Sequence, residues 1–206
     1  MQSHFSGCWW ILFLSCASAV QGVNQNVAER FSKGEVVPDL VDKAPQEGLM
    51  VTYTKGKEVN FGNELKPEDT EHQPNVAWLS RDSDLFTISM SDLDVPNREN
   101  PVTRSINHWL VINVKKNDLS SGDVIQSYRG PHPPKGSGLH RYVQLVYKQT
   151  GRIDKNSLPG ALFSDRRKFS IKNFAKEHNL GDPFAGNYYV AQYDGFFDRL
   201  PTNSSA

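Results

Sequence analysis

Two histidines are the residues of this sequence best suited to chemistry. His108 opens the run His-Trp-Leu-Val-Ile-Asn-Val, and His140 opens a second run rich in Val and Tyr. Protonatable imidazoles beside free backbone N–H groups suit an anion such as phosphate. A single histidine at the mouth of an apolar strand is more often a hydrogen-bonded core residue than a ligand. The two histidines therefore matter because they occupy the same kind of position.

A pair of aspartates adds to this signal. The segment Asp92–Pro96 reads Asp-Leu-Asp-Val-Pro and follows the predicted strand Leu85–Met90. In extended backbone, residues two apart project the same way, so we expect the two carboxylates to lie close together. Like charges at that distance require a partner, and Arg98 and Arg104 are near in sequence. The alternative is ordinary Asp-x-Asp turn chemistry before a proline.

A loop rich in glycine and proline leads into the second histidine. Residues 130–138 contain three prolines and three glycines, which exclude a regular helix or strand. From Leu139 the chain turns into a β-type run, on which His140 and Tyr142 share one face and Arg141 takes the other. The loop and strand predict a small polar pocket; a tight hairpin with a packed histidine is the alternative.

Six β-type runs, rich in β-branched and aromatic residues, must position these side chains. They are Leu49–Tyr53, Asn75–Trp78, Leu85–Met90, Trp109–Val114, Arg141–Lys148 and Tyr188–Tyr193. Side chains along the run that begins at His108 should alternate strictly between the two faces of the strand. One face would then carry His108, Leu110, Ile112 and Val114, and the other would carry Trp109 and Val111.

Two helices and one connection complete the expected elements. Helical spacing predicts a short helix over Val23–Ser32, with Val27, Ala28 and Phe31 on its apolar face. A second helix is predicted over Ile171–Leu180, begun by Ser170 and ended by Gly181. The acidic, proline-bearing segment Glu35–Gly48 is predicted to be an extended surface connection.

The N-terminus has the pattern of a secretory signal peptide over residues 1–22. The apolar run Cys8–Phe13 is followed by small residues, with cleavage expected after Ala19 or Gly22. A membrane anchor is the alternative, since no Lys or Arg precedes the run, but the run is well short of the roughly 20 residues of a spanning helix. We therefore predict secretion.

The mature chain, residues 23–206, would contain no cysteine, because both cysteines lie in the predicted signal peptide. Its length is sufficient for one domain with a substantial core and no disulfides. Asn203 begins a weak glycosylation sequon at the extreme C-terminus.

Composition and motifs exclude or weaken several functions. The 23 basic and 23 acidic residues balance, which argues against a nucleic-acid binder. There is no Gly-x-Ser-x-Gly nucleophile elbow. Two histidines and an aspartate could hold zinc, but the tight ligand spacing typical of such sites is missing, so a metal-dependent hydrolase is the weaker hypothesis.

Three parts of the sequence together resemble the hallmark segments of the phosphatidylethanolamine-binding protein family. They are the segment Asp92–Pro96 with Arg98, then His108, and then residues 133–142, which read Pro-Pro-Lys-Gly-Ser-Gly-Leu-His-Arg-Tyr. The resemblance implies a mostly-β fold, with a large central antiparallel sheet, a smaller sheet and peripheral helices. It also implies a small anion pocket for phosphate-like groups, including phospholipid headgroups. By matched position, the pocket residues would be Asp92, Pro96, His108, Gly130, Pro133, His140 and Tyr142, with Arg104 near the rim.

Departures from the family pattern concern the mouth of that pocket. His132 stands where relatives have a small residue, and it either adds positive charge at the mouth below about pH 6.5 or points to solvent. Pro201 stands where animal relatives carry an aromatic lid residue.

The resemblance implies a non-enzymatic binder, so we predict no catalysis, no metal and no cofactor. We expect a secreted carrier of a small anionic or amphipathic ligand, similar to insect antennal members of the family suggested to carry odorants. An extracellular serine-protease inhibitor, or a signalling regulator that acts by binding a protein, is the alternative.

Overall fold

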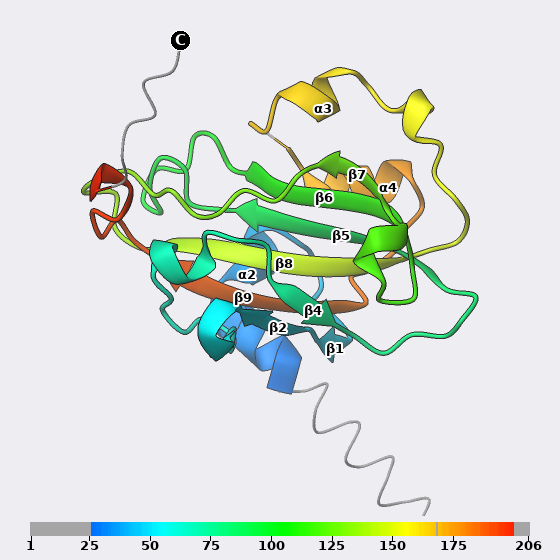
Figure 1. The fold of residues 1–206 in the computed structure, drawn as a ribbon, viewed down its shortest axis with the longest axis horizontal. Coiled ribbons are helices and arrows are strands. Elements are labelled where there is room, and N and C mark those ends of the chain that lie inside the picture. Colours follow the sequence, from blue (N-terminus) through cyan, green and yellow to red (C-terminus); the bar gives the residue numbers. More distant parts are fainter. Residues whose placement is uncertain (1–25, 168, 200–206) are drawn as a thin grey trace, which may run out of the picture.

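A six-stranded sheet forms the centre of the molecule, and a three-stranded sheet packs beside it (Figure 1). The computed structural model describes residues 26–167 and 169–199. In the large sheet the strand order is β1 (Glu47–Gly48), β9 (Ala185–Ala191), β8 (His140–Gln149), β5 (Leu85–Asp92), β6 (Ile106–Lys115) and β7 (Asp123–Gln126). In the small sheet it is β3 (Lys57–Glu58), β2 (Met50–Tyr53) and β4 (Asn75–Ala77). All pairs are antiparallel except β1 with β9, so the predicted fold class is confirmed.

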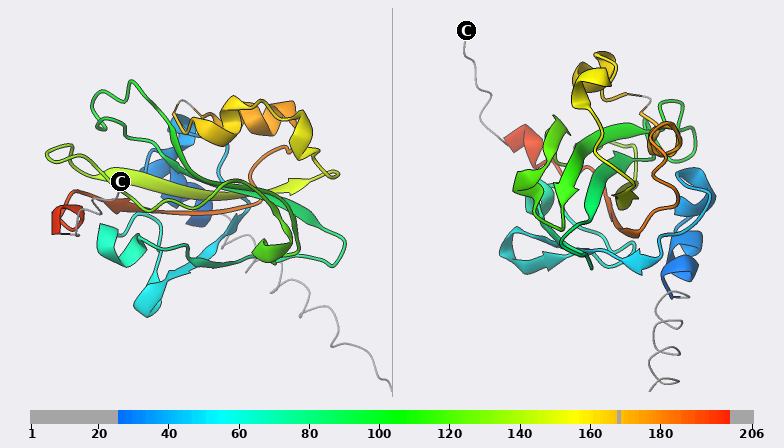
Figure 2. Two further views of the ribbon diagram at one scale, coloured as in Figure 1. Left: turned by 45° about the horizontal axis from the view of Figure 1, so that its top comes forward. Right: turned by 90° about the vertical axis from the view of Figure 1, so that its right-hand side faces the viewer.

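Each face of the large sheet buries its own hydrophobic core. Phe86, Ile88 and Met90 of β5 pack with Val51 of the small sheet on one face. On the other face the large sheet packs against a helix over residues 26–33 and against α4 (Ile171–Glu177). Figure 2 shows α4 and α3 (Ala161–Ser164) on the side of the large sheet opposite the small sheet. Both faces are therefore apolar, and polar residues on the buried strands need specific partners.

The predicted helices are found with small changes in extent. Ser170 begins α4 as predicted, because its hydroxyl accepts a hydrogen bond from the Asn173 N–H at 3.2 Å. In the helix over residues 26–33, Val27 and Phe31 are buried as expected, whereas Ala28 is exposed. Residues 23–25 of the predicted first helix, the signal peptide, Asn203 and Pro201 lie outside the described residues.

The prediction of a surface connection over Glu35–Gly48 was wrong. This segment contains α2 (Val36–Asp39) and β1, and it buries Val36, Leu40 and Val41 in the core that faces the helices. Its prolines and acidic residues suggested an exposed segment, although its few apolar residues are the ones that anchor it in the core. The strands β1, β3 and β7 were also missed, because they are short and carry few apolar residues.

Two irregularities in β6 overturn part of the predicted alternation. The register between β5 and β6 shifts twice, between Phe86 and Ile88 and between Met90 and Ser91. Leu110 and Ile112 share a face as predicted, but Val114 packs with Trp109 and Val111 on the other. His108 likewise packs edge-on against Tyr142, a member of the core that contains Trp109. β-bulges change the face of a side chain in this way.

Candidate functional site

Three adjacent strands bring four polar residues together at one end of the large sheet. β5 lies between β8 and β6, and Asp92 at its end is paired with Tyr142 of β8. His108 near the start of β6 contacts the Tyr142 ring with a centroid separation of 5.2 Å, and His140 stacks on the same ring at 6.4 Å. We call Asp92, His108, His140 and Tyr142 the imidazole cluster.

His140 and Asp92 form a buried pair. His140 Nδ1 lies 2.9 Å from Asp92 Oδ2, and both side chains are at most 5% exposed. His140 Nε2 lies 2.8 Å from Ser137 Oγ, and that hydroxyl donates its proton to the Pro134 carbonyl at 2.7 Å. Since the hydroxyl proton is used, Ser137 accepts from Nε2, while Nδ1 donates to the carboxylate. Both ring nitrogens of His140 are therefore engaged by neighbouring side chains.

His108 is oriented by a backbone carbonyl. Its Nδ1 donates to the Arg129 carbonyl at 2.8 Å. Burial lowers the pKa of His108, and the nearby charge of Asp92 opposes this only in part. A neutral His108 protonated on Nδ1 presents the lone pair of Nε2, and no hydrogen bond to Nε2 is found within the described residues.

The Tyr142 hydroxyl is the unsatisfied group of the imidazole cluster. It is buried and makes no hydrogen bond of acceptable geometry within the described part of the chain, although the Asp92 carboxylate lies close enough to interact with it. Burial raises the pKa of Tyr142, and the charge of Asp92 close by raises it further. The cluster thus presents a hydroxyl donor and an imidazole acceptor beside the buried His140–Asp92 pair.

The Gly/Pro loop closes over this end of the sheet. Gly130 packs so tightly on the backbone that a Cβ there would lie 2.8 Å from Glu71 Cα, so a larger residue is excluded. Pro133 is buried and lines a shallow hollow on the surface beside the loop. The hollow is lined by Arg129, His132, Pro133, Pro134, Lys135, Tyr193 and Asp198.

His132 does not simply point to solvent. Its ring is exposed but stacks on the Phe197 ring, with centroids 4.1 Å apart and planes 26° apart. The segment that carries Phe197 thus covers part of the loop, and an aromatic residue there was not predicted. His132 also lines the shallow hollow beside the loop.

The two aspartates do not project the same way, contrary to the sequence prediction. β5 ends at Asp92, and the Asp94 N–H bonds back to Asp92 Oδ1 at 2.9 Å, which turns the chain. Asp94 then lies on the other side of the sheet, where its carboxylate accepts from Arg141 Nε at 2.8 Å and Nη2 at 2.6 Å. As predicted, each carboxylate has a partner.

Arg141 is saturated with hydrogen bonds. Besides the two bonds to Asp94, Nη1 donates to the carbonyls of Gly34 and Glu35, and Nη2 donates to Asp39. These contacts use all five N–H groups of the guanidinium. Burial opposes ionisation of Asp94, but the hydrogen bonds and charge of Arg141 outweigh it, so the pKa of Asp94 is lowered.

Two of the predicted pocket residues stand apart from the imidazole cluster. Arg104 donates to the Leu93 carbonyl and pairs with Asp39 at 3.0 Å and Asp94 at 3.6 Å, on the Arg141 side. Pro96 is exposed in the turn beyond Asp94. The structure gathers the other predicted residues around the cluster and the loop.

Sequence reasoning missed two contributors to the site. Ser137 sits between the glycines of the loop, where its hydroxyl was a visible but unweighted signal. The Arg129 carbonyl orients His108, and no sequence pattern identifies a backbone acceptor. In the described parts of the chain, no group of three or more potential metal ligands and no helix long and apolar enough to cross a membrane are found.

Comparisons with known proteins agree with this architecture. A family model described as phosphatidylethanolamine-binding protein matches residues 44–189. The putative odorant-binding protein A5 of Drosophila melanogaster is 34% identical over 196 residues, which cover 92% of each chain.

Among solved structures, the carboxypeptidase Y inhibitor in complex with its cognate proteinase matches with a TM-score of 0.71 at 25% identity, covering 84% of this chain and 99% of the matched chain. The phosphatidylethanolamine-binding protein of Plasmodium falciparum matches with a TM-score of 0.65 at 25% identity, covering 80% and 96%. The family match spans most of the chain and contains the imidazole cluster. The chain belongs to the phosphatidylethanolamine-binding protein family.

Proposed function

We propose that this protein is a secreted, non-enzymatic binding protein whose imidazole cluster is a small anion pocket. Its ligand is a phosphate-like headgroup or a small amphipathic molecule that carries one. The observation that carries the proposal is the buried Tyr142 hydroxyl without a partner, beside His108 Nε2 and the His140–Asp92 pair. Leaving a buried donor unpaired costs about 1–3 kcal/mol, which a ligand oxygen would offset.

The chemistry of the cluster fits a phosphate monoester. Its anionic oxygens accept from the Tyr142 hydroxyl, while a protonated phosphate oxygen donates to His108 Nε2. Arg129, His132 and Lys135 at the mouth attract an anion, with Asp198 as the acidic exception.

Further observations support a carrier outside the cell. The relative from Drosophila is named a putative odorant-binding protein, and residues 1–22 have the pattern of a signal peptide. Leu139 and the Phe197 ring lie on or beside the loop over the pocket, so an apolar tail has surface to contact.

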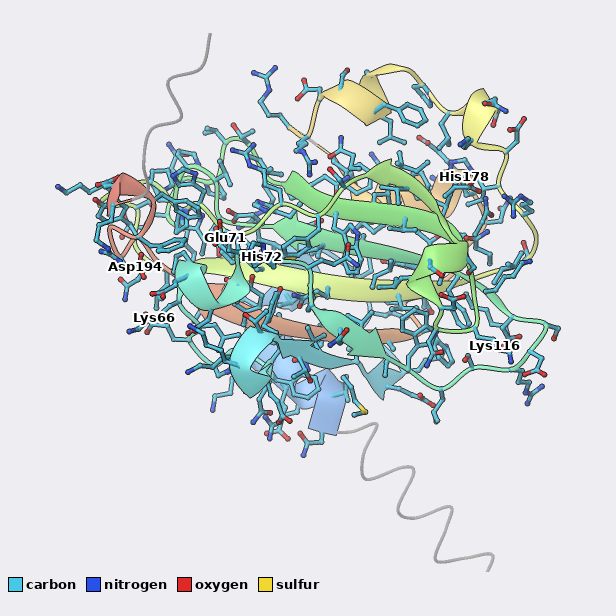
Figure 3. All side chains as sticks on the ribbon, in the orientation of Figure 1. Lys66, Glu71, His72, Lys116, His178 and Asp194 are labelled. Carbon is cyan, nitrogen blue, oxygen red and sulfur yellow. The ribbon has the colours of Figure 1, made fainter. Side chains whose placement is uncertain are left out.

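Titration calorimetry with hexyl phosphate tests the pocket. We expect His140→Asn to weaken binding by at least about tenfold, since it disrupts the hydrogen bonds from His140 to Asp92 and Ser137 that order the imidazole cluster. Tyr142→Phe tests the same pocket with less disturbance of the fold. His178→Ala is the matched control, because His178 lies at the opposite end of the molecule from Asp194 and the segment at the mouth (Figure 3).

The ligand series separates headgroup from tail. Hexanol lacks the phosphate, inorganic phosphate lacks the tail, and dihexanoyl phosphatidylethanolamine presents the phosphate as a diester in a lipid headgroup. If the wild-type protein, His140→Asn and Tyr142→Phe bind hexyl phosphate with equal affinity, the imidazole cluster is not the binding site.

Inhibition of an extracellular protease is the alternative function. The similarity to a carboxypeptidase Y inhibitor bound to its proteinase favours it. An assay of the purified protein against carboxypeptidase Y and other serine proteases tests it. Lack of inhibition at micromolar concentration argues against this function.

A further inference from the structure

A second cavity lies on the other side of the sheet end, behind the imidazole cluster. It has a volume of about 590 Å³ and lies among the helix over residues 26–33, the segment over residues 61–62 and β9. Arg141 contributes to its wall, and the Arg141 side chain points to the face opposite His140 and Tyr142. The cavity therefore shares no lining side chain with the imidazole cluster.

Positive charge gathers in this cavity although the whole chain has no net charge. The charged residues that line it are Arg30, Lys33, Arg98 and Arg141, opposed by Glu29 alone. Arg141 is neutralised by Asp94 and Asp39. The excess therefore comes from the other three cations.

Those three cations are available to a ligand. Among the described residues, the Arg30 guanidinium hydrogen-bonds to neutral side chains alone, to Asn26 at 2.5 Å and Asn60 at 3.3 Å. Lys33 forms no ion pair within the described residues. Arg98 pairs with Glu35 at 2.5 Å, but both side chains are well exposed, 43% and 65%, and such pairs exchange readily with another anion.

Two aromatic rings form an apolar part of the wall. The Arg30 guanidinium lies 5.2 Å from the centre of the Phe61 ring, and the Tyr188 hydroxyl donates to the Arg30 carbonyl at 3.0 Å. Gly34 makes room for that phenol, since a Cβ there would lie 2.1 Å from the hydroxyl oxygen. Tyr188 is buried and Phe61 is half-buried, so the apolar surface that a ligand can reach beside the guanidinium groups is chiefly the Phe61 ring.

We propose that this cavity is a second binding site, for a small organic anion that joins a phosphate or sulfate ester to a flat aromatic group. Arg30 and Arg98 hold the ester oxygens through paired N–H groups, and Lys33 adds a third cation. The aromatic group packs chiefly on the Phe61 ring. Burial raises the pKa of Tyr188 while the charges of Arg141, Arg30 and Arg98 oppose it, which agrees with guanidinium groups converging near this hydroxyl.

Titration calorimetry with phenyl phosphate tests the proposal through stoichiometry. We expect the wild-type protein to bind at two sites and the double variant Arg30→Gln/Arg98→Gln to lose one, with that affinity falling at least about tenfold. Tyr142→Phe should weaken the other site and leave this one unchanged. Lys43→Gln is the matched control, because Lys43 is an exposed cation paired with Asp182 elsewhere on the surface.

The outcomes separate the two sites. Unchanged phenyl phosphate binding in the double variant overturns the second site and leaves the first intact. A single site that is lost in the double variant but kept in Tyr142→Phe supports the cavity and contradicts the imidazole cluster. Inorganic phosphate and phenyl sulfate serve as further probes: if inorganic phosphate binds the cavity as tightly as phenyl phosphate, the aromatic wall has no role and the proposed ligand class is wrong.

Discussion

At the start of β8, the two faces of the sheet differ in how completely their buried polar groups are hydrogen-bonded. On one face, Arg141 has an acceptor for each of its five N–H groups. On the other face, no hydrogen bond within the described residues is found for the Tyr142 hydroxyl, one residue along β8, or for Nε2 of the adjacent His108 ring. A saturated network holds structure, whereas an unsaturated one leaves positions for a ligand.

The saturated face joins segments that are far apart in sequence. Arg141 binds the chain at Gly34, Glu35 and Asp39, and it meets Asp94 after β5. This network holds the N-terminal segment against the strand that carries His140. The functional face is thus built on a rigid support made by its reverse side.

An unpartnered buried atom does not mark a site by itself. The Ser89 and Ser91 hydroxyls also have no partner, but they lie on the helix-covered face of β5, beside Leu145 and Val143 of β8. The Tyr142 hydroxyl differs because two imidazoles, a carboxylate and a loop surround it. The combination distinguishes the imidazole cluster, as the sequence had suggested for its histidines.

Removing Asp94 is the change with the largest expected effect. Asp94→Ala leaves Arg141 buried without its main counter-charge, and breaking such a pair costs about 3–5 kcal/mol. We expect that loss in the free energy of unfolding, measured by urea titration with tryptophan fluorescence. Asp182→Ala, which breaks an exposed pair with Lys43, should cause little change. Equal stability of the two variants would contradict a structural role for the Arg141 face.

Two tyrosine variants compare a satisfied hydroxyl with an unsatisfied one. Tyr128 donates to the Thr70 carbonyl at 2.7 Å, so Tyr128→Phe should lower the free energy of unfolding by about 1–3 kcal/mol. Tyr142→Phe removes a hydroxyl without a partner and should leave stability unchanged or slightly raised, while binding of hexyl phosphate weakens. If Tyr142→Phe is as unstable as Tyr128→Phe, its hydroxyl has a structural partner and the contrast fails.

The pH dependence of stability offers a smaller test of the open face. The pKa of His108 is lowered in the folded state, so the unfolded chain binds the proton more readily. The stability due to neutral His108 is complete above about pH 6.5 and is lost as the pH falls below it, with a slope of at most about 1.4 kcal/mol per pH unit. Urea titrations between pH 7 and 5 should give a shallower slope for His108→Gln. An unchanged slope would mean that His108 is charged in the folded protein.

Local sequence patterns were sufficient to predict most of the long secondary-structure elements and the residue types of the candidate site. Period-two apolar runs predicted the long strands, and the Asp-x-Asp, histidine and Gly/Pro segments indicated the candidate site. Ser170 begins α4 as predicted, but the helix ends at Glu177, before the predicted end at Gly181. These signals lie within short stretches of chain, so they can be recognised without knowledge of the fold. Alternation along β8 also predicted correctly that His140 and Tyr142 oppose Arg141.

Tertiary structure alone decided where several of those groups point. The bulges in β6 turn His108 toward Tyr142, and the turn after Asp92 sends Asp94 to the Arg141 face. The contact of His132 with Phe197 joins segments more than sixty residues apart. Register shifts and long-range contacts follow from pairing with other strands, and no local periodicity encodes them. The sequence therefore determined which groups are present, and the packing of distant segments determined which of them remain free to bind.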